Sequence, residues 1–310
     1  MAIFRDLEQL PEFTKPVITI GSFDGVHHGH KSILEQVVQE AKTIGGESIL
    51  ITFFPHPRKI IHPEIPLGLL TAPEQKMQLI NELGIDHIVV VPFSREFSMM
   101  SAEDYIDHFL WTNFCPEVIV LGYDHHFGHS REGNIDLLRA KLSPKVKISE
   151  IPAQLIEDAA VSSTKIRKAL AAGDVELANE MLERPFAFSG TVVHGEKLGR
   201  QLGFPTANLR LNFPDILIPK QGIYVVRVGF EGQQYSGMMS IGVRPTINDK
   251  NITSIEVNIL DFDDDIYGCT LDIECLHYLR EEQKCDSLDA LIQLIRNDEE
   301  QTRAFFENRD

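Results

Sequence analysis

The sequence predicts two folded parts of different class: an α/β domain with a doubly wound parallel sheet at residues 1–185, and a small antiparallel β-barrel with a closing C-terminal helix at residues 186–310. In the first part, short apolar runs alternate with segments of helical spacing, which is typical of a parallel sheet covered by helices. From Phe186 onward, short alternating runs follow one another between Gly, Pro and Asn residues, which is typical of a small barrel or sandwich. A chain of 310 residues is long enough to bury two such cores.

The elements of the first part are predicted from periodicity and from the residues that end each run. Strand candidates are short apolar runs, several of which stop at Gly or Pro, and helix candidates have apolar residues on one face. Thr71 and Glu74 have the spacing of a capping box. Strands are expected at 17–20, 48–54, 87–91, 118–121 and 146–151, and helices at 31–44, 71–84, from 101, at 162–172 and at 174–182. Because doubly wound sheets bind ligands at the carboxyl ends of their strands, Gly21 and Gly122 mark the expected site.

The strands of the second part are short and regularly interrupted by turn residues. Their alternation of apolar and polar side chains indicates that one face of each strand lies in a core. They are expected at 189–193, 224–230, 235–241, 254–260 and 271–276. A last helix is expected from Ser287 to about Asn308.

Composition and charge argue against several classes of protein. With 29 basic and 46 acidic residues the formal net charge is −17, which disfavours the broad basic surface that nucleic-acid binding needs. No run approaches ~18 apolar residues, and residues 1–13 have no apolar core of a signal peptide, so neither a membrane span nor an export signal is expected. The four cysteines form no CxxC pair, which favours reduced thiols and a cytoplasmic location.

The first candidate site is a glycine-rich turn between a strand and a helix, GSFDGVHHGH at residues 21–30. Gly29 lets the backbone come close to a phosphate, and the helix N-terminus supplies N–H donors and a favourable dipole. His27 and His30 form an HxGH pattern, and two imidazoles can donate hydrogen bonds to a phosphate oxygen that gains charge as its bond breaks. The pattern suits nucleotidyl transfer from ATP. Four such residues also recur by chance, and it is the strand before them and the helix after them that favour the functional interpretation.

Two further features of the first part have more than one interpretation. Residues 162–167, Ser-Ser-Thr-Lys-Ile-Arg, open a helix whose hydroxyls, N–H groups and Arg167 suit the β- and γ-phosphates of ATP. A simple helix cap explains that segment equally well. The histidines at positions 27, 28, 30, 125, 126 and 129 have spacings that permit a zinc site, but only Asp24 and Asp124 are nearby acidic ligands, so zinc is the less favoured hypothesis.

The second candidate site is a longer glycine-rich tract at residues 190–208. Four glycines within fourteen residues, 190–203, give a loop whose backbone can wrap a phosphate. Thr206 and Asn208 follow at a spacing that puts both side chains on one face of a strand, and their oxygens suit Mg²⁺. The tract lacks the GK[ST] ending of a Walker A motif. A glycine-rich barrel turn is the alternative, but it does not explain the Thr and Asn behind the loop.

A carboxylate of the second part is a candidate general base. Residues 254–260 alternate, and Glu256 shares one face with Asn258. If that face looks into the barrel, Glu256 lies near an apolar site and is fit to accept a hydroxyl proton. From the pattern alone a solvated strand face is favoured. The acidic run 263–265 is interpreted as a solvated turn rather than a metal site.

Residues 15–170 resemble the HxGH nucleotidyltransferase domain of the bacterial bifunctional riboflavin kinase/FAD synthetases, a Rossmann-like fold. The matching stretches are 21–30, 55–57, Gly122-x-Asp124 with Phe127-Gly128, and 162–167. The resemblance implies an ATP site made of Gly21, Ser22, Phe23, Asp24, His27, Gly29, His30, Asp124, Ser163, Thr164 and Arg167. The chain departs from the family at Ser22, where Asn is usual, at His126, where Arg is usual, and at Phe54, where an acidic residue is common.

Residues 186–308 resemble a riboflavin kinase domain, and the tract 190–208 matches the family signature without a gap. Residues 240–242, 244–246 and Glu256 with 260–262 match as well. The resemblance implies that Thr206 and Asn208 contact Mg²⁺ and the phosphates of ATP, and that Glu256 deprotonates the 5′-hydroxyl of the ribityl chain. The remaining ATP-binding candidates are Gly190, Gly195, Lys197, Gly199, Arg200, Gly203 and Pro205.

Taken together, the two resemblances imply a bifunctional enzyme. Its second part would phosphorylate riboflavin to FMN with ATP and Mg²⁺, and its first part would transfer an adenylyl group from ATP to FMN, giving FAD and pyrophosphate. Small molecules are the expected partners, without nucleic acid or membrane. The alternatives are a riboflavin kinase with an impaired first domain and a non-catalytic flavin-binding protein.

Overall fold

The computed structural model describes residues 1–152, 161–195, 199, 202–244 and 252–308, and it forms two compact units. The first unit combines Met1–Leu67 with Pro73–Ser163, and the second combines Gly68–Ala72 with Thr164–Asp310. The barrel unit begins before residue 185, because helix α10 (Val175–Leu182) packs on two barrel strands. The functional boundary near residue 185 stays a prediction.

Six parallel strands form the sheet of the first unit, in the order β1-β4-β3-β2-β5-β6. The strand order reverses at β2, which has β3 on one side and β5 on the other, so the ends of β2 and β5 form a topological switch point. All five predicted strands are present, and β1 is an additional three-residue strand at the edge. The bounds are β1 Ala2–Phe4, β2 Val17–Ile20, β3 Ser48–Phe54, β4 His87–Pro92, β5 Val118–Gly122 and β6 Lys147–Ile151.

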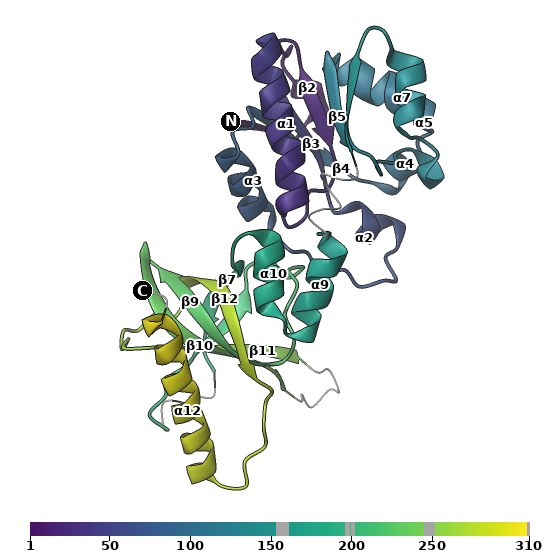
Figure 1. Cartoon of the computed structure of the whole chain (residues 1–310). Helices are drawn as coiled ribbons and strands as arrows, with labels where there is room; N and C mark the ends of the chain where they lie inside the picture. Colours follow the sequence, from purple (N-terminus) through teal and green to yellow (C-terminus); the bar gives the residue numbers. More distant parts are fainter. Residues whose placement is uncertain (153–160, 196–198, 200–201, 245–251, 309–310) are drawn as a thin grey trace. The chain divides into compact units, whose positions relative to one another are not determined.

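Helices cover both faces of this sheet (Figure 1). Alternate strand residues face opposite layers: Val17 and Leu50 pack with α1 and α3, whereas Ile18 and Ile49 pack with the helical segment 102–114 and α7. The bounds are η1 Leu7–Gln9, α1 His28–Ile44, α2 Pro57–Ile61, α3 Pro73–Glu82, α4 Arg95–Ser98, α5 Ala102–Asp104, η2 Tyr105–Trp111, α6 Thr112–Phe114, η3 His129–Arg131 and α7 Ile135–Leu142. The segment predicted as one helix from Ser101 contains a π-helical part, η2, and α7 was not predicted.

The second unit is a closed antiparallel barrel with strand order β10-β11-β8-β7-β12-β9. Its bounds are β7 Phe186–Val193, β8 Ala207–Leu211, β9 Gly222–Phe230, β10 Gln233–Arg244, β11 Ile252–Ile259, β12 Thr270–Arg280, α9 Ser163–Ala172, α10 Val175–Leu182 and α12 Leu288–Glu307. On β11 the apolar residues Ile255, Val257 and Ile259 are buried, so Glu256 and Asn258 lie on the outer face of the barrel. The condition that Glu256 looks into the barrel is therefore not met.

Side-chain caps fix three of the predicted helix starts. The hydroxyl of Ser101 accepts a hydrogen bond from the N–H of Asp104 at 3.1 Å. Asp174 caps α10 and Ser287 caps α12 in the same way. Each cap satisfies a backbone donor that the first turn of a helix leaves unpaired.

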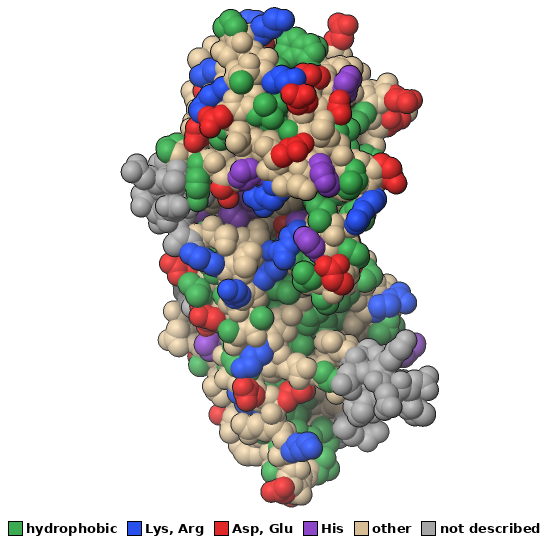
Figure 2. Space-filling model, turned by 90° about the vertical axis from the view of Figure 1, so that its right-hand side faces the viewer, with side chains coloured by type: hydrophobic (Ala, Val, Ile, Leu, Met, Phe, Trp, Pro, Cys, Tyr) green, Lys and Arg blue, Asp and Glu red, His purple; other side chains and the backbone are tan. Residues whose placement is uncertain are grey.

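Acidic, basic and hydrophobic side chains are interspersed on the face drawn in Figure 2. In the part of the chain that the structure describes, no helix is both long and apolar enough to span a membrane.

Candidate active sites

The first candidate site lies at the switch point of the parallel sheet. Strands β2 and β5 pair directly, and Gly21 and Gly122 stand at their neighbouring carboxyl ends. The N–H of Gly21 still donates to the carbonyl of Ile51 on β3 at 3.0 Å, so the turn after β2 begins in register with the sheet. This is the position predicted for a ligand in a doubly wound fold.

The turn after β2 has an unusual backbone. Phe23, Gly25 and Val26 have φ angles of 47°, 91° and 41°, in the left-handed region that non-glycine residues rarely adopt. Phe23 and Val26 are nevertheless buried. A Cβ on Gly21 would stand 2.9 Å from the Phe23 ring, so glycine is what lets that ring fold back over the strand end. The turn is compact and strained, and its surroundings must hold it in place.

The HxGH residues meet at the start of α1. His27 precedes the helix in an extended conformation, and its carbonyl accepts hydrogen bonds from the N–H groups of His30 and Lys31 at 2.8 and 3.0 Å. The rings of His27 and His30 stack, with centroids 3.7 Å apart. His27 is only 6% exposed, Gly29 is buried, and His28 points to solvent. The structure therefore brings both predicted imidazoles together at a helix N-terminus.

Lys76 on α3 also reaches this turn, although it belongs to none of the sequence motifs. Its Nζ donates to the carbonyl of Ser22 at 3.0 Å and to the hydroxyl of Thr52 at 3.1 Å. The Thr52 hydroxyl lies 3.3 Å from the same Ser22 carbonyl. Burial lowers the pKa of Lys76 to about 8, although the nearby Asp24 carboxylate acts in the opposite direction.

The segment 162–167 is divided between the two compact units. Ser163 belongs to the first unit, and its hydroxyl donates to the carbonyl of Asp24 at 2.9 Å. Thr164 and Arg167 belong to the second unit, where Arg167 Nε donates to the carbonyl of Gly68 at 2.8 Å. The structure thus brings Ser163 to the HxGH turn, and the ATP contacts of Thr164 and Arg167 stay predictions.

The loop after β5 presents the remaining predicted residues of the first site. Asp124 is exposed. Burial lowers the pKa of His125 to about 4, so its imidazole is neutral at pH 7. His126 Nδ1 lies 3.2 Å from the carbonyl of Gly133. Among the described residues no group of three or more His, Cys, Asp or Glu side chains is arranged to hold a metal ion.

The second candidate site is a row of side chains on the outer face of the barrel. Asn208 of β8 and Ser240 of β10 are the cross-strand neighbours of Glu256 on β11. The hydroxyl of Thr206 donates to Glu256 Oε2 at 3.1 Å. Asn258 Nδ2 donates to the carbonyl of Pro205 at 2.7 Å and so fixes the segment that carries Thr206. The three residues predicted for kinase chemistry are therefore within reach of one another.

The glycines of the tract 190–208 have different structural roles. A Cβ on Gly195 would stand 2.5 Å from Asn208 Cγ, and a Cβ on Gly199 would stand 2.4 Å from the carbonyl oxygen of Phe204. Only glycine lets the loop approach the Asn208 side chain and the Phe204 backbone so closely. Gly203 has a φ of +86°, which glycine favours, and Gly190 lies inside β7, paired with Leu211 and Leu271. Lys197 and Arg200 lie outside the described residues.

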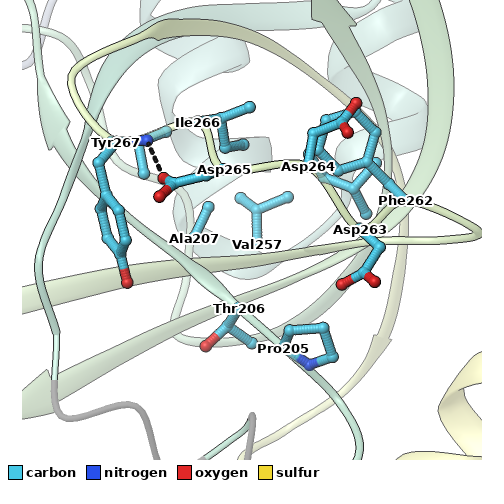
Figure 3. A pocket seen from close by; sticks show the side chains of 12 residues that line it. Pro205, Thr206, Ala207, Val257, Phe262, Asp263, Asp264, Asp265, Ile266 and Tyr267 are labelled. Carbon is cyan, nitrogen blue, oxygen red and sulfur yellow. Dashed lines mark hydrogen bonds between the residues drawn. The ribbon is translucent and has the colours of Figure 1, made fainter.

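Two cavities adjoin Thr206. The larger has a volume of about 440 Å³, and its polar side contains Thr206, Asn208 and Glu256. Its apolar side comes from the barrel surface and α12: Leu202, Phe204, Ile223, Met238, Leu291, Leu294 and Ile295. The smaller, of about 60 Å³, is shown in Figure 3: Thr206 and Pro205 lie across it from the acidic turn Asp263–Tyr267. In that turn the N–H of Tyr267 donates to Asp265 Oδ1 at 3.2 Å, as the turn interpretation predicts.

An ion pair anchors the helix that walls the larger cavity. Arg280 Nε and Nη2 donate to the two carboxylate oxygens of Asp298 at 2.8 and 2.5 Å. Asp298 is 3% exposed, and Arg280 belongs to β12, so the pair ties α12 to the barrel. Such a bidentate pair fixes both distance and orientation.

Comparisons with known proteins bear on both units. A family model described as FAD synthetase matches residues 10–165, and one described as riboflavin kinase matches residues 182–306. The chain is 38% identical to the bifunctional riboflavin kinase/FMN adenylyltransferase of Listeria monocytogenes, over 94% of this chain and 92% of that protein. It is 34% identical to the enzyme of the same description from Escherichia coli, over 99% and 98% of the two chains. The solved structure of a Streptococcus pneumoniae protein named macrolide-efflux protein matches with a TM-score of 0.87 at 30% identity, over 97% of this chain and 98% of that one.

Proposed function

The chain belongs to the bifunctional riboflavin kinase/FMN adenylyltransferase family, and we propose that its two reactions use the two sites described above. Riboflavin is phosphorylated to FMN at the barrel, and FMN is adenylylated to FAD at the parallel sheet. Catalytic domains at 1–185 and 186–310 are part of this proposal; the riboflavin kinase model begins at residue 182, near that boundary, whereas the compact units divide after Ser163. The efflux in the name of the Streptococcus pneumoniae protein is not extended to this chain, because both family models describe flavin chemistry.

One observation carries the kinase assignment: Thr206 lines both cavities and contacts Glu256. The larger cavity has an apolar side suited to a flavin ring and a polar side that holds Glu256. A ribityl chain in that cavity can bring its 5′-hydroxyl to Glu256. The smaller cavity then takes part of the nucleotide, and the phosphate to be transferred lies beside Thr206.

The chemical step needs little beyond position and charge. Glu256 accepts the proton of the 5′-hydroxyl while the hydroxyl oxygen bonds to the γ-phosphorus of ATP. The bond between that phosphorus and the β–γ bridging oxygen breaks, and ADP leaves with the electron pair. Because Asn258 holds the Pro205 carbonyl, Thr206 is fixed relative to Glu256 before the substrates arrive.

The donor set beside Glu256 fits Mg²⁺. Thr206, Asn208 and Glu256 offer a hydroxyl, an amide and a carboxylate oxygen, and Mg²⁺ binds few protein oxygens besides water and substrate phosphates. Gly195 lies so close to Asn208 that no side chain would fit at position 195. A backbone without side chains suits a turn that binds phosphate. When bound, the ion would offset the negative charge of the ATP phosphates. Thr206 and Asn208 are the residues proposed to hold it.

Adenylyl transfer is proposed at the HxGH turn. A phosphate oxygen of FMN attacks the α-phosphorus of a second ATP, and pyrophosphate leaves with the electron pair of the broken bond. His27 and His30 are stacked at the N-terminus of α1, where their N–H groups can donate to the phosphate oxygens as charge develops.

With four free thiols and small-molecule substrates, we place the enzyme in the cytoplasm.

Chromatographic product analysis of Glu256→Gln tests the two-site assignment. We expect FMN formation from riboflavin to fall 10²- to 10⁴-fold, the range that a general base contributes, while FAD formation from supplied FMN is unchanged. Glu274→Gln is the matched control, because Glu274 lies on another barrel strand and pairs with Arg227 at 2.9 Å. Equal loss of both activities in Glu256→Gln would contradict two separate sites, and FMN as the sole product of the unmodified chain would favour the impaired-domain alternative.

A further inference from the structure

Lys76 is a partly buried cation at the adenylyl-transfer site that neither the HxGH motif nor the helix 162–172 includes. It lies on α3, 54 residues from Ser22 and 24 residues from Thr52, the two residues that its ammonium contacts. Both acceptors are neutral oxygens. Within the described ranges no carboxylate lies within ion-pair distance of Lys76, and Asp24 acts on it only through its field. A cation is costly to bury in such surroundings, so its place calls for an explanation.

The turn that Lys76 holds is the one whose backbone is strained. Phe23, Gly25 and Val26 all have positive φ, and for a β-branched residue such as Val26 this is a true outlier. Such conformations are strained and persist only where surrounding contacts impose them. Three side chains contact carbonyls of this turn: Lys76 and Thr52 contact that of Ser22, and Ser163 contacts that of Asp24. The turn leads directly into His27, which precedes α1.

We propose that Lys76 is a positioning residue for adenylyl transfer, which holds the Ser22 carbonyl and so fixes the turn that presents His27 and His30. Lys76 Nζ donates both to the Ser22 carbonyl and to the Thr52 hydroxyl, and the Thr52 hydroxyl donates to the same Ser22 carbonyl. The positive charge also remains at the strand ends, where polyphosphate arrives. The depressed pKa of Lys76 agrees with an ammonium group that is partly withdrawn from water.

Steady-state kinetics of Lys76→Met and Thr52→Val test the proposal. A residue that orients the histidines acts on the transition state, so kcat for FAD formation from FMN should fall at least tenfold in Lys76→Met. The KM for ATP should stay within threefold. Thr52→Val should lower kcat less, and the double variant should lose less than the product of the two single losses, because the groups act together. Lys42→Met, on the exposed side of α1, is the matched control and should match the unmodified enzyme.

Three results would overturn the proposal: kcat within twofold of the unmodified enzyme in Lys76→Met, a tenfold rise in KM for ATP with unchanged kcat, or strictly independent effects of the two variants. If Lys76→Met does not fold in the first unit, judged by its thermal unfolding, Thr52→Val decides the question. The proposal rests on adenylyl transfer at the HxGH turn. Normal FAD formation in His30→Ala would contradict that premise. If His30→Ala loses FAD formation but Lys76→Met keeps a normal kcat, only the role of Lys76 is refuted.

Discussion

Gly195→Ala tests the proposed magnesium site through a steric effect that can be worked out from the structure. The added Cβ would lie 2.5 Å from Asn208 Cγ and 2.7 Å from its Oδ1, with the amide nitrogen closer still. Ordinary contact begins at 3.4 Å and the amide nitrogen would lie at 2.2 Å, so the amide group must move by about 1.2 Å. Asn208 can do so by rotating its side chain, because the obstructing atoms are at its flexible end. The substitution is therefore expected to displace the amide oxygen proposed to bind Mg²⁺ and to leave the fold unchanged.

A shift of this size is large for Mg²⁺ coordination. Mg²⁺–oxygen distances are fixed near ~2.0–2.1 Å, and a misplacement of ~1 Å in an active site can cost ~100-fold in rate. We therefore expect kcat/KM for riboflavin phosphorylation to fall about 100-fold, or ~2.7 kcal/mol of transition-state stabilisation. Half-saturation by Mg²⁺ should move to higher concentration. FAD formation from supplied FMN should be unchanged, and the free energy of unfolding should change by less than ~1 kcal/mol.

The assay is initial-rate formation of FMN across a titration of MgCl₂ at saturating ATP, with thermal unfolding measured on the same samples. Gly229→Ala is the control, because on strand β9 its Cβ would lie 3.3 Å from Asp272 Cβ and 3.5 Å from Gln234 Nε2, and neither Thr206 nor Asn208 is among its nearest neighbours. An unchanged Mg²⁺ dependence in Gly195→Ala would refute Asn208 as a ligand. A large decrease in the free energy of unfolding of Gly195→Ala would refute the expectation that only the Asn208 side chain moves.

Two further predictions concern the first unit. His30→Ala should lower FAD formation 10²- to 10³-fold, the range found for single donors to a developing charge, and leave FMN formation intact, whereas His108→Ala on the exposed side of η2 should change neither. The pKa of His125 is lowered by burial from 6.5 to about 4, so the unfolded chain binds its proton more readily than the folded one. The free energy of unfolding should therefore fall as pH drops from about 6.5 to about 4. Urea unfolding at pH 7, 5.5 and 4.5 should show a smaller fall for His125→Gln than for the unmodified protein. Parallel profiles for the two proteins would contradict the assignment.

Much of the fold follows from local patterns. Every strand predicted in the first part is present, because a parallel strand buried on both faces is a continuous apolar run. The helices expected from 101, 174 and 287 begin there, with Ser101, Asp174 and Ser287 as their caps, since a cap is a contact within three residues along the chain. The edge strand β1 was missed because three residues carry too little periodicity, and helix α7 was also not predicted.

The candidate site was predicted in part. HxGH and the tract ending at Asn208 are contiguous in sequence, so their residue types and spacing could be recognised. The direction in which Glu256 points could not be predicted, because alternation gives two faces and does not say which one the rest of the chain covers. Ile255 and Val257 fill the barrel, and Glu256 instead faces a cavity closed by α12, a helix that begins 32 residues later.

The sequence by itself therefore determined the two architectures, their order, and the two glycine-rich tracts with the side chains that follow them, because each depends on residues close together in the chain. Only the tertiary structure decided that Thr206 stands between two cavities, that Glu256 lies on the outside of the barrel, and that Lys76 lies under the HxGH turn. From the sequence alone, Lys76 on α3 would be expected to be an ordinary solvent-exposed lysine. It becomes a partly buried cation only because strands β2 and β3 bring Ser22 and Thr52 to its ammonium, and the burial of a charge is set by partners distant in sequence.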